Sequence, residues 1–156
     1  MRFLTGGRAT SRAEIVDDVL PAFLGYYARY PGYGFWAAHE PTGGGFVGWF
    51  HLCPRPDGPT DEPELGYRLR RAAWGKGYAA EGARALVDRA FGELGARRVV
   101  GETMAVHTAS RRVLEKAGLR YVRTFHQPWP ERIEGDEHGD VEYARTRAEW
   151  ARVSGR

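Results

Sequence analysis

The chain has little cysteine, no long apolar run and little excess of either charge, and each shortage excludes a class of protein. Cys53 is the single cysteine among 156 residues, so an intramolecular disulfide is impossible and a cysteine-based metal site is not expected. No apolar run approaches the length of about 18 residues that a membrane span needs. Residues 1–7 lack the apolar stretch of a secretory signal. We therefore expect a cytoplasmic protein with no membrane partner.

The charges are nearly balanced. The sequence has 23 lysines and arginines against 20 aspartates and glutamates, for a net charge of +3. Because the basic residues are spread along the chain and form no block, nucleic acid is not an expected partner. With 42% hydrophobic and 28% charged residues, the composition is that of a globular protein. Its length suits a single domain over residues 1–156.

Hydrophobic spacing and turn residues predict helices alternating with strands. A capping box from Ser11 to Glu14 opens a first helix, and Pro21 should kink that helix or split it in two. The mixture of hairpins and crossovers implies an α/β domain with a mixed sheet. The later elements expected are a hairpin at 35–39 and 46–53, strands at 64–69, 98–104, 119–126 and 141–147, and helices at 79–94 and 108–117.

The most informative segment, residues 69–79, joins a predicted strand to a predicted helix. Gly75 and Gly77 let the backbone turn sharply and approach a ligand closely. Free amides in the first turn of the helix, together with the helix dipole, suit a phosphate or pyrophosphate. A plain strand-to-helix turn would also explain the two glycines. Neither the nucleotide P-loop nor the dinucleotide fingerprint is present. Positive charge near the turn is available from Arg70, Arg71 and Lys76.

Residues 74–79 read Trp-Gly-Lys-Gly-Tyr-Ala and resemble the acetyl-CoA loop of the GNAT superfamily of N-acetyltransferases, written Gln/Arg-x-x-Gly-x-Gly/Ala. Tryptophan at the first position is usual in the branch that resembles ribosomal-protein N-terminal acetyltransferases. The strand at 64–69 and the block at 107–119 also match that branch, although His107 stands where the branch has asparagine. Two separated motifs in the right order make the joint resemblance specific, and it covers residues 33–147.

The resemblance implies a mixed, mostly antiparallel central sheet with helices on both faces. The sheet would be splayed open for CoA between the strands at 64–69 and 98–104. The resemblance also implies that the family's first strand is missing, because relatives carry a strand and part of a helix before the segment like residues 1–7. Another element, or a second copy in a homodimer, would then cover the exposed sheet edge.

The resemblance implies acetyl-CoA as co-substrate and no metal. The pantetheine arm would pair with the backbone near Tyr67 and Leu69, and the pyrophosphate would rest on the amides of residues 75–79. His107 would replace the asparagine that orients the cofactor arm, since imidazole can donate or accept one hydrogen bond. A solvated helix face explains Arg111 equally well. The cofactor-binding residues expected are Tyr67, Leu69, Arg70, Trp74, Gly75, Lys76, Gly77, Tyr78, Ala79, His107 and Arg111.

The implied reaction moves an acetyl group to a neutral amine. At pH 7 the deprotonation of a lysine-like amine costs roughly 4–5 kcal/mol, whereas that of an α-amine costs only about 1 kcal/mol. Glu64 enters the strand beside the loop and is the candidate general base, although a surface carboxylate is an open alternative. Ser110 resembles the serine that assists the thiolate leaving group in this branch. A helix-start cap would also explain it.

The sequence does not identify the acceptor amine. A protein N-terminus, a polyamine or an aminoglycoside-like small molecule would each suit the resemblance. The alternative function is a catalytically inactive CoA-binding module, which would hold the cofactor and transfer nothing. The acidic connection at 134–140 could attract a cationic amine, although a solvated turn explains it more simply. Packing likewise explains four aromatic residues that could line an acceptor pocket: Tyr33, Trp36, Trp49 and Trp129.

Overall fold

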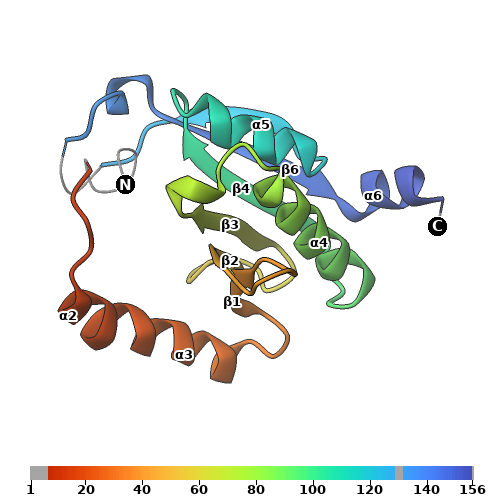
Figure 1. Ribbon diagram of the computed structural model, residues 1–156. Coiled ribbons are helices and arrows are strands. Elements are labelled where there is room, and N and C mark those ends of the chain that lie inside the picture. Colours follow the sequence, from red (N-terminus) through yellow and green to blue (C-terminus); the bar gives the residue numbers. More distant parts are fainter. Residues whose placement is uncertain (1–6, 129–131, 156) are drawn as a thin grey trace.

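The computed structural model describes residues 7–128 and 132–155 and arranges them around one six-stranded sheet (Figure 1). The strands are β1 (Gly34–His39), β2 (Phe46–Pro54), β3 (Pro63–Leu69), β4 (Arg98–Met104), β5 (Arg120–Phe125) and β6 (Asp140–Thr146). Their order is β1-β2-β3-β4-β6-β5, and each neighbouring pair is antiparallel except β3 with β4. The predicted mixed, mostly antiparallel sheet is therefore confirmed.

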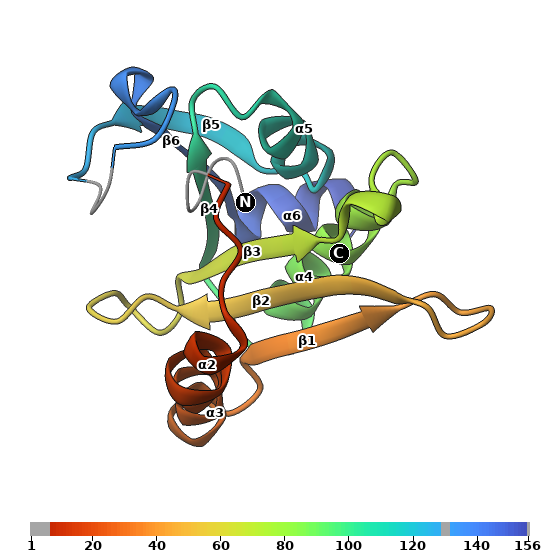
Figure 2. The same cartoon turned by 60° about the vertical axis from the view of Figure 1, so that its left-hand side comes forward.

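Helices lie on both sides of the sheet. They are α2 (Arg12–Glu14), the π-helical η1 (Ile15–Val19), α3 (Leu20–Arg29), the 3-10 turn η2 (Arg71–Ala73), α4 (Tyr78–Gly92), α5 (Thr108–Lys116), the 3-10 turn η3 (Asp136–His138) and α6 (Arg147–Ser154). Figures 1 and 2 show α2 and α3 beside the β1 edge, apart from α4 and α5. None of the helices within the described part of the chain is long and apolar enough to cross a membrane.

The two helical layers meet opposite faces of the same strands. Gly82 of α4 lies so close to the ring of Phe50 that a Cβ at position 82 would overlap it. Phe23 of α3 stacks on Phe35 of β1, with ring centroids 3.4 Å apart. Phe35 lies opposite His51, the neighbour of Phe50. Because successive side chains of a strand point to opposite faces, α3 and α4 lie on different sides of the sheet.

The N-terminal helix follows the prediction. Ser11 caps it, with the Glu14 amide 3.1 Å from the Ser11 hydroxyl and the Ser11 amide 2.8 Å from the Glu14 carboxylate. The helix is then interrupted by η1, and Pro21 lies in the first turn of α3. Since proline has no amide hydrogen to donate to the preceding turn, the π-helical segment accommodates it and divides the helix as expected.

The C-terminal helix α6 departs from the prediction. The sequence predicts a strand through residue 147 and no helix after it, whereas β6 ends at Thr146 and α6 begins at the next residue. Thr146 and Glu149 form a capping box at this point, so a local signal for the helix is present. The indole of Trp150 in α6 donates to Asp88 in α4 at 2.6 Å, which fixes α6 against the helical layer.

The core lies between the sheet and the layer of α4 and α5. The apolar face predicted for α4 is confirmed, since Ala83, Val87 and Phe91 are each at most 1% exposed. They pack with Leu52 and Val99 of the sheet. Three alanines along α4 are buried in the same layer. Small side chains let the helix approach the strands closely, and this brings the start of α4 to the end of β3.

The strands β3 and β4 separate soon after they begin. Their parallel pairing is limited to Glu64 with Val100, and from there β3 runs on to Leu69 and β4 to Met104 without pairing. The predicted opening between these two strands is thus confirmed. β1 is the edge strand of the sheet as described. The predicted absence of the family's first strand, which relatives carry before the segment like residues 1–7, stays a prediction.

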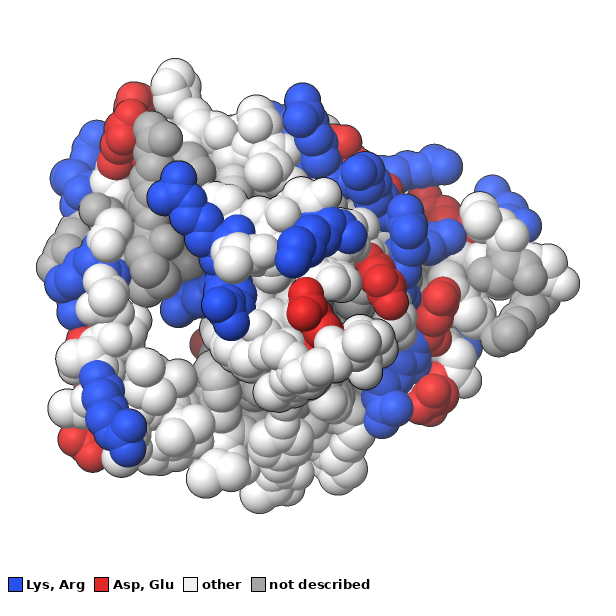
Figure 3. All heavy atoms as spheres, in the orientation of Figure 1, with Lys and Arg blue, Asp and Glu red and all other residues white. Residues whose placement is uncertain are grey.

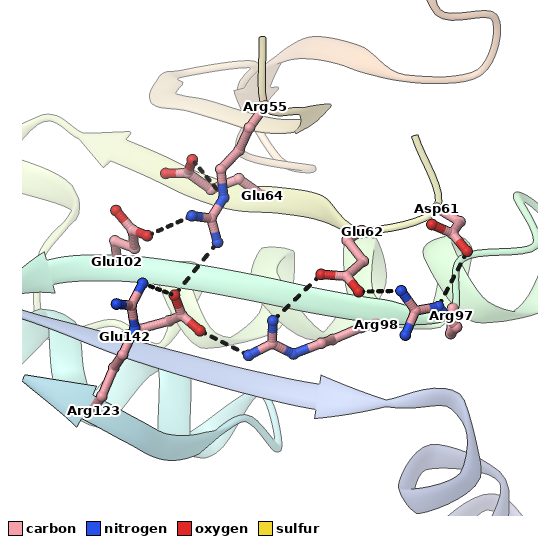
Figure 4. Close-up of polar contacts among 9 residues, drawn as sticks. All are labelled: Arg55, Asp61, Glu62, Glu64, Arg97, Arg98, Glu102, Arg123 and Glu142. Atoms are coloured by element: carbon pink, nitrogen blue, oxygen red, sulfur yellow. Dashed lines mark hydrogen bonds and ion pairs between the residues drawn. The ribbon is translucent and has the colours of Figure 1, made fainter. Parts of the chain in front are cut away.

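The sheet face opposite α4 and α5 carries a buried carboxylate, Glu142 of β6 (Figure 4). Its side chain is only 6% exposed and lies 2.7 Å from Arg98, 3.1 Å from Arg123 and 3.7 Å from Arg55. Burial alone would raise the pKa of Glu142, but the hydrogen bonds from Arg98 and Arg123 outweigh it and hold the pKa below its usual value. The ionised carboxylate therefore holds three arginines together.

Replacing Glu142 with glutamine should lower the free energy of unfolding by about 3 kcal/mol, because it removes the buried charge with which three arginines pair. The exposed pair of Arg89 and Glu93 supplies a control, and Glu93→Gln should change stability by less than about 0.5 kcal/mol. Urea denaturation at pH 7 measures both. The pKa of Glu142 is lowered by folding, so its contribution is present above the unfolded pKa of about 4.3 and is lost as the pH falls through the folded pKa. Equal losses in the two variants would contradict this role.

Candidate active site

The turn between β3 and α4 is open and shaped by two glycines. Gly75 and Gly77 have φ angles of +73° and +86°, in the left-handed region that favours glycine. A Cβ built at either position would meet nothing within 4 Å. The first i→i−4 bond of α4 is donated by Glu81 to Gly77, so the amides before Glu81 have no partner within the helix. A 15-residue helix thus presents free donors and its positive dipole end to an open space.

Side chains around this turn hold it to the sheet. The exposed indole of Trp74 donates to the Leu69 carbonyl at 3.0 Å, and Arg70 donates to the Phe46 carbonyl at 3.2 Å. The Glu40 carboxylate, at the end of the β1–β2 hairpin, lies 3.6 Å from the Lys76 ammonium and accepts from Tyr78 at 3.0 Å. Sequence reasoning missed Glu40, because only the folded hairpin brings it to the turn.

Mixed charge surrounds this region. On the face seen in Figure 3, lysine and arginine side chains are spread widely, with acidic side chains among them. Lys76 is already paired with Glu40, so it offers less free charge than the sequence suggests. Arg71 is exposed, with no hydrogen bond or ion pair to another described side chain. Its charge is therefore the more available one at the turn.

The edge of β3 that faces the opening has free backbone groups. The Arg70 amide donates to Val47 of β2 at 3.0 Å, and Arg68 lies opposite Trp49. Residues of an antiparallel pair alternate between bonding to the partner strand and facing away from it. The backbone groups of Tyr67 and Leu69 therefore face the opening, where an arm with amide groups could pair with them.

The side chain of Tyr67 crosses to the start of α5. Its hydroxyl donates to the Ser110 carbonyl at 2.9 Å and lies 3.1 Å from the Ser110 hydroxyl. Burial raises the pKa of Tyr67 to about 12, so the phenol keeps its proton at neutral pH. The N-cap of α5 is His107, and Ser110 is the third residue of the helix, so the helix-cap explanation of Ser110 is wrong. The hydroxyl pair was not evident from the sequence, which points only to the Tyr67 backbone.

The other two residues predicted near α5 lie partly inside the protein. His107 is half-buried, and burial lowers its pKa, which favours the neutral imidazole at pH 7. Arg111 donates to the Tyr143 hydroxyl at 3.0 Å and to the Ala105 carbonyl at 3.1 Å. Tyr143 in turn donates to Glu115 at 3.0 Å. Arg111 thus fastens α5 to the sheet, and its predicted contact with the cofactor stays a prediction.

Glu64 lies on the other side of the opening from Ser110. It pairs with Val100 where β3 and β4 part, and its carboxylate is 3.9 Å from the Arg55 guanidinium (Figure 4). Arg55 also binds Glu102 at 2.8 Å. Burial, followed by the charge of Glu102, raises the pKa of Glu64, and Arg55 opposes this shift. Glu102 and Arg55 escaped the sequence reasoning, although a glutamate inside an apolar strand is a usable signal.

The opening thus has a proton acceptor on one side and hydroxyl donors on the other. The side chains of Leu65 and Tyr67 point toward α4 and α5, whereas that of Glu64 points to the opposite face, because side chains alternate along β3. A reacting group held within the opening would have Ser110 on the helical side and Glu64 on the other. This arrangement suits proton removal from one reactant and proton supply to another.

The acidic connection before β6 is mostly satisfied internally. Asp136 accepts from Arg132 at 2.8 Å, and Asp140 accepts from Gln127 at 3.0 Å. These carboxylates therefore offer little free charge to a cationic amine. Within residues 7–128 and 132–155, no three histidine, cysteine, aspartate or glutamate side chains gather in a way that could hold a metal ion. Trp129 lies outside the described residues.

Comparison with known proteins gives the family. The model of the acetyltransferase (GNAT) domain matches residues 1–120. The FsC-acetyl coenzyme A-N(2)-transacetylase of Aspergillus fumigatus is 44% identical over 159 residues, covering 98% of this chain and 66% of the relative. The uncharacterized protein YkkB of Bacillus subtilis is 36% identical over 102 residues, covering 62% of this chain and 57% of the relative. The chain therefore spans about two thirds or less of the length of these relatives.

Solved structures agree on the fold. RimL, a ribosomal-protein α-N-acetyltransferase solved in complex with coenzyme A, superposes with a TM-score of 0.74 at 20% identity, covering 93% of this chain and 78% of RimL. An acetyltransferase from Agrobacterium tumefaciens gives a TM-score of 0.64 at 26% identity, covering 90% of this chain and 74% of that one. With the strands splayed at Glu64, a glycine turn before α4 and a family model over residues 1–120, the chain belongs to the GNAT acetyltransferase family.

Proposed function

We propose that the protein is an N-acetyltransferase that moves an acetyl group from acetyl-CoA to a primary amine by direct attack, and that residues 1–156 form one N-acetyltransferase domain. The open glycine turn at the mouth of the gap between β3 and β4 carries this proposal. The family uses acetyl-CoA, and the name of the fungal relative gives acetyl coenzyme A and an N(2) position. The acceptor is a protein N-terminus or a small-molecule amine. The cytoplasmic location and the homodimer stay predictions.

The residues of the turn suit a bound pyrophosphate. The amides of Tyr78 and Ala79 precede the first hydrogen bond of α4, and Gly75 and Gly77 leave the approach to them open. Arg71 adds positive charge that no other described side chain neutralises. The backbone of Tyr67 and the amide of Leu69 supply an acceptor and donors along the gap for the amide groups of the pantetheine arm.

Glu64 removes a proton from the attacking amine, directly or through one water. A raised pKa suits this role, because a base works best when its pKa lies near the working pH. Arg55, at 3.9 Å, opposes this rise and favours the ionised carboxylate that accepts the proton. Ser110 serves the leaving group. Its hydroxyl, oriented by Tyr67 at 3.1 Å, donates a hydrogen bond to the departing thiolate, whose pKa is about 8.5 by analogy with cysteine.

Gly77→Glu should weaken acetyl-CoA binding by at least about tenfold, because a carboxylate would repel the pyrophosphate at the dipole end of α4. Gly95→Glu is a matched control. Gly95 also has a positive φ (+72°) and open space around it, and it follows the other end of α4. Calorimetric titration with acetyl-CoA measures both variants. Unchanged binding by Gly77→Glu would remove the turn from the site. A wild-type protein that binds acetyl-CoA but acetylates nothing in a broad amine panel would be the inactive CoA-binding module.

Glu64→Gln should lower turnover by at least about tenfold, whereas Glu102→Gln, which changes the neighbouring carboxylate held by Arg55, should leave most of it. Turnover of the wild-type protein should rise with pH through the raised pKa of Glu64, since only the ionised form accepts a proton. In Glu64→Gln this rise of turnover with pH should vanish, so that only the titration of the amine substrate shapes the pH profile. A pH profile that Glu64→Gln leaves intact would exclude Glu64 as the base. If only Glu102→Gln lost the rise of turnover with pH, Glu102 would be the general base.

Ser110→Ala should reduce kcat by about tenfold or more with little change in acetyl-CoA affinity, because it removes only the donor to the thiolate. Thr108→Ala removes an exposed hydroxyl from the same helical turn and should have no effect on kcat. Steady-state release of free CoA and calorimetry measure the two quantities. If Ser110→Ala lowered only the melting temperature, the hydroxyl would have a structural role alone.

A further inference from the structure

Two buried polar atoms on the sheet face opposite α4 and α5 have no hydrogen-bond partner among the described residues: the Arg68 Nε and the His51 Nδ1. Arg68 lies opposite Trp49 and Gly66 lies opposite His51 in the pairing of β2 with β3. A Cβ on Gly66 would overlap the imidazole, so His51 fills the space between Arg68 and Glu64. Unpaired buried groups are rare in folded proteins, and each requires an explanation.

Arg68 differs from the other arginines of this face. Arg55, Arg98 and Arg123 each lie within 4 Å of a carboxylate, whereas Arg68 forms no ion pair with any described residue. Its guanidinium instead lies over the Trp49 ring, 5.3 Å from the centroid. Burial lowers the pKa of Arg68. A partly buried guanidinium without an anion is unfavourable, and an anionic ligand would remove this disadvantage.

The surroundings of Arg68 are well defined. The Trp49 ring beneath it contacts Phe23 and Phe35, with centroids 5.5 Å and 5.9 Å away. Burial, with a smaller effect of the Arg68 charge, lowers the pKa of His51 to about 4. His51 is therefore neutral at pH 7 and can donate or accept a hydrogen bond without repelling a cation or an anion. The guanidinium of Arg68 is itself a planar set of donors that matches a carboxylate.

Arg68 lies on the same strand face as Glu64, the proposed base, so that one acceptor molecule could contact both. Glu64 and Arg68 are on the same face of β3, four residues or about 13 Å apart along the strand, with the glycine at position 66 between them. Both lie along the part of β3 that borders the opening. A molecule resting on this face could place its amine near Glu64 and an anion near Arg68.

We propose that Arg68, with His51 beside it, binds a carboxylate of the acceptor, so that the acceptor is an amine that also carries a carboxylate, such as an amino acid or short peptide. This inference rests on the proposed acetyl transfer. It favours amino acids and peptides over polyamines, whose additional positive charges Arg68 would repel. For a peptide acceptor, deprotonation of the α-amine at pH 7 costs only about 1 kcal/mol.

The test uses glycine, diglycine and triglycine, each compared with its C-terminal amide, titrated calorimetrically into protein saturated with CoA. Within each pair only the carboxylate differs, and the series measures its distance from the amine. At least one free acid should bind about tenfold more tightly than its amide, and Arg68→Gln should abolish that preference. Arg29→Gln, which changes an exposed arginine stacked on Tyr30, should leave it intact.

Three outcomes would overturn the carboxylate site: equal affinity for acid and amide, an Arg68→Gln protein that keeps the preference, or no binding of any member while acetyl-CoA binds normally. A wild-type protein that fails to bind acetyl-CoA would instead refute the proposed function itself. Urea denaturation of Arg68→Gln checks its fold, and we expect stability equal to or above that of the wild type, because an unpaired charge is removed.

Discussion

The strands β3 and β4 pair at a single position, Glu64 with Val100, and the site depends on this constraint. Because pairing stops at Glu64 and Val100, the backbone groups of Tyr67 and Leu69 face a gap instead of a neighbouring strand. Unpaired backbone groups in the interior are as unfavourable as lost hydrogen bonds. The Trp74 indole satisfies the Leu69 carbonyl, and the Tyr67 phenol spans the gap to α5. The backbone groups of Tyr67 and the amide of Leu69 remain available to a ligand in the gap.

The two faces of the sheet have different chemistry. The face under α4 and α5 is closely packed and apolar, and it fixes the positions of Tyr67 and Ser110. The opposite face carries glutamates and arginines in contact with one another (Figure 4). These two environments meet at the gap between β3 and β4.

Most of the fold and half of the site could be predicted from the sequence, because caps and glycine turns act over a few neighbouring residues. The Ser11 cap and the turn at Gly75 and Gly77 are signals of this kind. The carboxylate cluster could not be predicted, since Glu102 meets Glu142 only through the pairing of β4 with β6. The bond between Tyr67 and Ser110 likewise joins residues 43 positions apart, and no local pattern encodes it.

The Trp74 indole has a consequence beyond the shape of the turn. An unpaired strand edge invites pairing with another chain and so promotes aggregation. By occupying the Leu69 carbonyl, Trp74 shortens the free row of backbone groups on β3 to little more than the neighbourhood of Tyr67. So short a row cannot support a new β-ladder. The gap therefore offers a slender ligand a few backbone partners, while it gives another chain little edge on which to add a strand.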